Sequence, residues 1–180
     1  MAFTALSIVL GVALVAGGAT AWRGSGRLDT AAAHLPRARV AGEVLGIVCL
    51  VWSAYYGCLM LEGGLAVYRK LVWALVPVTA FLAYNHLDYL FARSFGGILI
   101  LCAGFLLHGA FVVDVPCRGL YSVVCYLAGL SGMCLIAVPW RFRDLLQALA
   151  RQVPWRRPLA VVSVAAGGVL VVFPLLVKAR

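Results

Sequence analysis

Polar side chains are few within the apolar segments of this chain, and one group of them gathers near the Arg-rich segment ends. This inner polar group comprises Glu43, Asn85, His86, Asp88 and Arg93. A charge buried in hydrocarbon costs roughly a few kcal/mol, so such residues commonly mark a polar site or a solute pathway. The alternative interpretation is local, in that the five side chains solvate a turn and pair with one another.

A second group surrounds the one histidine that falls well inside an apolar segment. This outer aromatic group comprises His108 with Trp52, Tyr55, Tyr56, Tyr121 and Tyr126, all expected at about the same depth. An imidazole among aromatic and hydroxyl groups could bind a quinone headgroup, a lipid or a partner helix. The competing interpretation is the ordinary belt of aromatic residues at a membrane interface.

No catalytic set accompanies these groups. Ser131, between Gly129 and Gly132, is superficially similar to the serine motif of rhomboid proteases, but no histidine follows it to serve as the base. The chain has neither a phosphate-binding GxxxxGK[ST] loop nor a CxxC pair. Its three histidines are too scattered to share a haem or a metal ion. The sequence predicts no metal and no cofactor, and it does not favour an enzyme.

Composition assigns the elements that carry these groups to a membrane. Of 180 residues, 64% are apolar and 12% are charged, whereas about a quarter of a soluble domain is charged. One soluble core cannot hide that much apolar surface, so the bilayer is the expected solvent. The cations behind the net charge of +9 lie between apolar segments and form no stripe on a folded surface, which argues against nucleic acid as a partner.

Six apolar segments are long enough to span a bilayer as helices. They cover residues 2–22, 40–61, 71–87, 94–113, 119–140 and 159–177. Residues 141–153 instead place Phe142, Leu145 and Leu149 at helical spacing among charged side chains, which predicts an amphipathic helix. That helix could be an interfacial connector or a docking surface for a cytoplasmic partner. We therefore expect an all-α, polytopic transmembrane bundle of about six spans plus one interfacial amphipathic helix, in a single domain over residues 1–180.

The distribution of Lys and Arg predicts the orientation. Ten of the fifteen lie after the first, third and fifth spans. Since cytoplasmic loops carry the excess of positive charge, both termini are expected outside. Arg outnumbers Lys thirteen to two, which indicates a GC-rich genome and a bacterial plasma (inner) membrane.

Small residues at four-residue spacing predict close helix packing. Gly42 and Gly46 have this spacing in the second span, and Ala13 and Gly17 have it in the first. The other candidate packing residues are Gly96, Gly97, Gly132 and Gly167. Such residues let helix backbones approach within one chain or against another subunit.

Three functions stay open at this point. The leading hypothesis is a non-catalytic integral-membrane subunit, or an assembly or scaffold protein, of a larger membrane complex. Its partners would be the bilayer and other membrane subunits or copies of itself. The alternative is a small oligomeric transporter or channel for a small solute or ion, which would use the inner polar group. The third is a lipid- or quinone-binding membrane protein, which would use the outer aromatic group.

Overall fold

The computed structural model describes residues 2–23, 39–61, 63–86, 89–113, 115, 117–151 and 153–178. Within them the chain is an all-α bundle, as predicted, and six helices are long and apolar enough to cross a membrane. In chain order the elements are α1 (Ala2–Arg23), α3 (Arg39–Met60), η2 (Gly63–Tyr68), α4 (Arg69–His86), α5 (Leu90–Val112), α6 (Arg118–Ala137), α7 (Trp140–Arg151) and α8 (Val153–Lys178).

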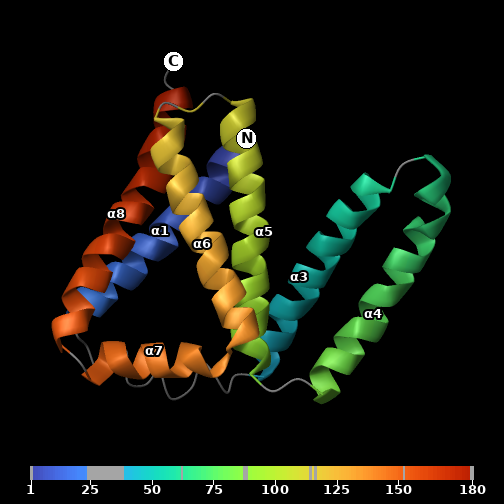
Figure 1. Cartoon of the computed structure of the whole chain (residues 1–180), viewed down its shortest axis with the longest axis horizontal. Helices are drawn as coiled ribbons and strands as arrows, with labels where there is room; N and C mark the ends of the chain where they lie inside the picture. The colour runs from blue at the N-terminus through green and yellow to red at the C-terminus, as the bar shows by residue number, and fades with distance from the viewer. Residues whose placement is uncertain are drawn as a thin grey trace.

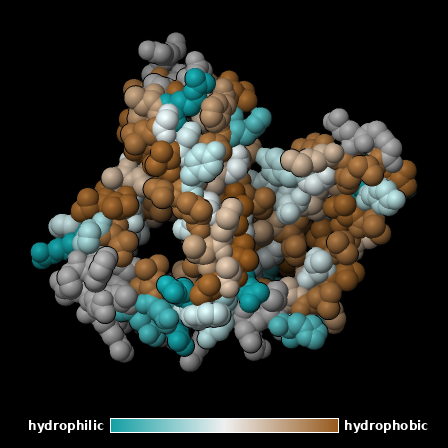
Figure 2. Space-filling model, viewed as in Figure 1, coloured by the Kyte–Doolittle hydropathy of each residue, from teal (hydrophilic) through white to brown (hydrophobic). Residues whose placement is uncertain are grey.

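The long helices run alternately up and down, so both chain ends lie at the same end of the bundle (Figure 1). The short helix α7 lies across the opposite end. The closest helix pairs are α1 with α8 and α5 with α6, while α3 packs on α5 and α4 packs on α3. Figure 2 shows apolar side chains along the sides of the helices and hydrophilic side chains along α7.

Four helix boundaries differ clearly from the sequence prediction. α8 begins at Val153, before the predicted residue 159, and the other three differences lie at identifiable backbone features. α5 begins at Leu90, before the predicted residue 94, directly after Tyr89 in the left-handed conformation (φ 55°, ψ 41°). α6 ends at Ala137, before the predicted residue 140, because Val138 leaves helical dihedrals (φ −132°, ψ 70°). Pro139 follows, and its ring disfavours a helical conformation for the residue in front of it. The third candidate span begins at Leu65 because the turn η2 leads directly into α4.

The core lies where α1, α5, α6 and α8 meet. Its fully buried side chains include Leu106 of α5, Tyr121 of α6 and Leu170 of α8, and Phe3 of α1 packs beside them. Apolar packing of this kind holds helices together in a bilayer, where lipid is as apolar as the side chains and dispersion contacts decide the fit. The α3–α4 pair stands outside this core.

Candidate functional site

The inner polar group does not form one connected site among the described residues. Glu43 on α3 and Arg93 on α5 are half-buried, and His86 is exposed at the end of α4. The Asn85 side-chain amide donates to the Phe81 carbonyl of its own helix (2.9 Å), so it satisfies itself locally. No hydrogen bond or ion pair joins these four described side chains, and Asp88 lies outside the described residues.

The outer aromatic group is divided between separate parts of the bundle. Trp52 lies beside Tyr56 on α3 (ring centroids 6.4 Å apart), and it meets Phe105 of α5 edge-on at 6.3 Å. Tyr55 contacts Tyr56 at 5.8 Å. These rings cover the α3–α5 contact. His108 is exposed on α5 and Tyr126 is exposed on α6, so neither lies in an enclosed pocket with the other rings.

Tyr121 belongs to a different, buried cluster that joins three helices. The Ser7 hydroxyl of α1 donates to the Leu170 carbonyl of α8 (2.6 Å). Its proton is thereby used, so the Tyr121 hydroxyl of α6 donates to Ser7 Oγ (2.8 Å). The Phe3 ring lies 6.1 Å from the Tyr121 ring. We name Ser7, Tyr121 and Leu170 the three-helix junction, and its role is structural. Ser7 is not among the residues predicted from sequence, and its one signal there is a serine within an apolar span.

The six predicted packing glycines all lie against a neighbouring helix. A Cβ on Gly132 would stand 2.6 Å from the Gly96 carbonyl, and a Cβ on Gly96 would stand 2.7 Å from the Gly132 carbonyl. The other four meet α5, α3 or α1: Gly42 meets Phe91, Gly46 meets Ser94, Gly97 meets Cys49, and Gly167 meets Gly11. The Ser94 hydroxyl also donates to the Gly42 carbonyl (3.0 Å).

In α1, the residues in contact differ from the pair that spacing indicates. Gly17 faces open space, whereas Gly11 and Gly18 touch α8. A Cβ on Gly11 would stand 2.8 Å from the Gly167 carbonyl, and one on Gly18 would stand 2.9 Å from the Ala160 carbonyl. The two glycines are seven residues apart, which is two helical turns on one face. A seven-residue glycine spacing, and not a four-residue one, therefore indicates this contact.

The amphipathic helix α7 turns part of its apolar face toward the bundle. The Phe142 ring lies 6.0 Å from Phe91 and 6.2 Å from Phe95, both on α5. Arg143 pairs with Asp144 at 3.4 Å on the exposed side. Phe142 is half-buried in this contact, so part of the apolar face of α7 packs within the chain.

The α3–α4 hairpin projects from the bundle, and α4 is its outer element (Figure 1). None of the residues of α4 is buried, and α4 packs on α3 and η2. Pro77 interrupts it. Because proline has no N–H, the Trp73 carbonyl lacks the helical donor that position 77 would otherwise provide. The Thr79 hydroxyl cannot replace that donor, because it donates to the carbonyls of Leu75 and Val76 (2.9 and 3.0 Å).

The Trp73 carbonyl, which Pro77 leaves without a helical donor, makes α4 the candidate interaction site. In hydrocarbon each backbone polar group needs a partner, and proline is tolerated where a neighbouring helix provides one. α3 covers one side of α4, and the remaining sides are open in the isolated chain. We call α3, η2 and α4 together the arm.

Comparison of the chain with protein-family models, with curated proteins and with solved structures finds no match. The class of protein therefore follows from the fold alone, which is an all-α bundle with six apolar helices of membrane-spanning length. Within the described residues, no three His, Cys, Asp or Glu side chains come together as a metal site would require.

Proposed function

We propose that this chain is a non-catalytic integral-membrane subunit, or scaffold protein, that assembles with another membrane protein through its arm. The occupant of the open side of α4 is a transmembrane helix of that partner. The observation that carries the proposal is a full-length apolar helix with none of its residues buried and an interrupted backbone at Pro77. A helix of the partner with a polar side chain at this depth would supply the hydrogen bond that lipid cannot give.

The transport alternative has less support. A transporter of this kind builds its site from polar groups and broken helices that converge near the middle of the bilayer. The described polar side chains that do converge, Ser7 with Tyr121 and Ser94 with the Gly42 carbonyl, are used to fasten one helix to another. His108, the centre of the lipid- or quinone-binding alternative, is exposed on α5.

Photo-crosslinking at the arm tests the scaffold proposal. A photoreactive amino acid at Leu75 or Phe81, both exposed on α4, is expected to capture a defined membrane protein in cells. The same substitution at Val162, exposed on α8, is the matched control and should give at most diffuse labelling. The measurement is the band pattern on a denaturing gel, with mass spectrometry of each discrete product. Equal patterns from α4 and α8 would contradict the proposal.

The protein is placed by this proposal in a bacterial plasma membrane, as a multi-pass protein with both termini outside. The supporting observation is that α7 and the Arg-rich segment ends lie together at one end of the bundle, opposite both chain ends (Figure 1). Positive charge of this kind marks the cytoplasmic side.

Cys117 reports this orientation. It is exposed in the α5–α6 connection, at the same end of the bundle as the chain ends. A membrane-impermeant thiol reagent added to intact cells or spheroplasts is expected to label the protein there. Cys117→Asn should remove that label, and asparagine tolerates the left-handed backbone of this position (φ 51°). Labelling that appears only after the membrane is permeabilised would reverse the orientation.

A further inference from the structure

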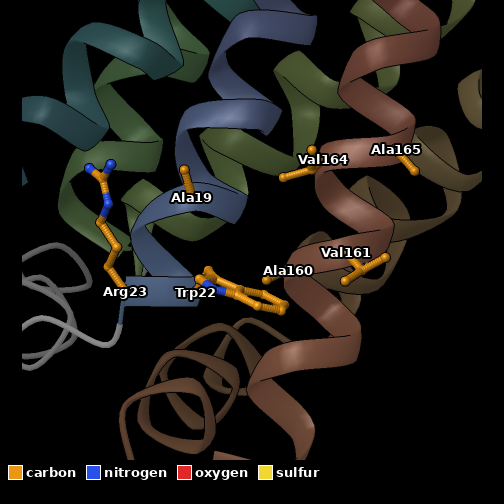
Figure 3. Close-up of a pocket in the computed structure, with 7 residues that line it drawn as sticks. All are labelled: Ala19, Trp22, Arg23, Ala160, Val161, Val164 and Ala165. Atoms are coloured by element: carbon orange, nitrogen blue, oxygen red, sulfur yellow. The ribbon is translucent and has the colours of Figure 1, made fainter.

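A groove of about 520 Å³ lies where the last turn of α1 meets the first half of α8 (Figure 3). α1 contributes Ala19, Trp22 and Arg23, and α8 contributes Ala160, Val164 and Ala165 to its lining. The Trp22 side chain extends from α1 toward Ala160 of α8 (Figure 3). The groove lies at the end of the bundle that carries α7, far from the arm (Figure 1).

The lining selects a hydrocarbon occupant. Arg23 is its one charged residue, and the remaining lining residues are aliphatic apart from Trp22. The volume falls in the range of about 300–1,000 Å³ that small-molecule sites occupy. An indole at this end of a span belongs at the level of lipid headgroups. The groove therefore lies at the depth in the bilayer where an acyl chain joins its headgroup.

Two arginines near the α7 end of the groove, Arg156 and Arg23, favour a negatively charged headgroup. Arg156 lies four residues before Ala160 on α8, so it stands one turn below the lining on the same face. Its Nε is buried and has no hydrogen-bond partner among the described residues. Arg23 stands at the same end of α1, with its side chain on the side of α1 away from α8 (Figure 3). The half-buried Arg156 and the lining residue Arg23 place two cations at the headgroup level of a lipid whose acyl chain fills the groove.

We propose that this groove is a binding site for one anionic phospholipid. The acyl chain lies between α1 and α8, and the phosphate accepts hydrogen bonds from Arg156, with Arg23 adding positive charge. A zwitterionic lipid fits the groove equally well but gains less from the two cations. The site is independent of the arm, so its test is independent of the scaffold proposal.

The test is lipid retention by the full chain after reconstitution in vesicles of equal phosphatidylglycerol and phosphatidylethanolamine. After extraction in mild detergent, native mass spectrometry is expected to show one retained phosphatidylglycerol per chain, with little phosphatidylethanolamine. Arg156→Gln should lower the retained phosphatidylglycerol about fivefold, the effect of one cation near a headgroup. Arg143→Gln, on the exposed side of α7, is the matched control and should retain lipid normally.

A second pair of variants tests the apolar part of the site. Ala165→Phe fills the groove and should expel both lipids, whereas Val162→Phe changes an exposed residue of α8 that does not line the groove and should leave retention unchanged. Equal retention of the two lipids in the unmodified protein would overturn the proposal, as would equal losses in Arg156→Gln and Arg143→Gln. Displacement of the lipid by inorganic phosphate alone would also overturn it, since the site would then bind a free anion.

Discussion

Gly132→Leu is expected to separate α5 from α6 and to destabilise the protein by about 3 kcal/mol or more. The reason is the reciprocal contact in which Gly96 and Gly132 each face the other's backbone carbonyl, with ideal Cβ positions 2.6–2.7 Å from oxygen. A flexible side chain could move aside, but a backbone carbonyl moves only if the whole helix moves. Reversible unfolding in detergent, followed by tryptophan fluorescence, measures the change.

Gly119→Leu is the matched control on the same helix. A Cβ at Gly119 meets nothing within 4 Å, and leucine is a better helix former than glycine by up to about 1 kcal/mol. This variant should therefore be neutral or slightly more stable than the unmodified protein. If the two leucine variants unfold at the same denaturant concentration, the close α5–α6 approach is not a source of stability.

Tyr121→Ala is expected to cost about 3–5 kcal/mol, as for the removal of other large aromatic side chains from a core. Tyr121 is 0% exposed, and it fills the space where α1, α6 and α8 meet. Its removal leaves a cavity and also breaks the hydrogen bond to Ser7. The free energy of unfolding and the resistance of the α1–α8 pair to proteolysis should both fall.

Two further variants distinguish the contribution of the Tyr121 ring from that of its hydroxyl, and the effect of a buried tyrosine from that of an exposed one. Tyr121→Phe keeps the ring and should cost only about 0.6–1 kcal/mol, the usual contribution of one hydrogen bond between helices. Tyr126→Ala, on the same helix at a position 61% exposed, should change stability by less than about 0.5 kcal/mol. A loss at Tyr126 as large as that at Tyr121 would show that the measurement does not report on the junction.

The general fold was predictable because apolar length and small residues have direct physical consequences. In a bilayer each backbone polar group needs a partner, and a helix satisfies its groups within one segment, so six apolar segments lead to six helices of spanning length. A glycine within a span permits close contact whichever helix lies opposite, so Gly96 and Gly132 could be identified without knowing that they face each other. The identity of the opposite helix was not predictable. Gly11 and Gly167 are in contact although they lie near opposite ends of the sequence. A four-residue spacing of small residues does not indicate which helix lies opposite.

The candidate sites were less predictable, because depth in a membrane does not give the direction of a side chain. His108 and Tyr121 were expected together on depth alone, yet one is exposed and the other is buried. Asn85 was grouped with other polar residues near it in sequence, although its own helix satisfies it. The exposure of α4 could not be read from sequence either. Its apolar composition is like that of the other spans, and only their arrangement leaves it outside.

Because α1 packs against α8, the bundle can be completed only after the last helix has been synthesised. Ser7 and Leu170, which form one hydrogen bond, are 163 residues apart. At an elongation rate of about 5–20 residues per second, roughly 10 to 30 s pass between the synthesis of Ser7 and that of Leu170. Throughout that interval the glycine face of α1 has no partner, while α5 and α6 can already associate as neighbours in the chain. α8 is thus the closing element, and a chain that stops before α8 leaves the Gly11 and Gly18 face of α1 without its partner helix.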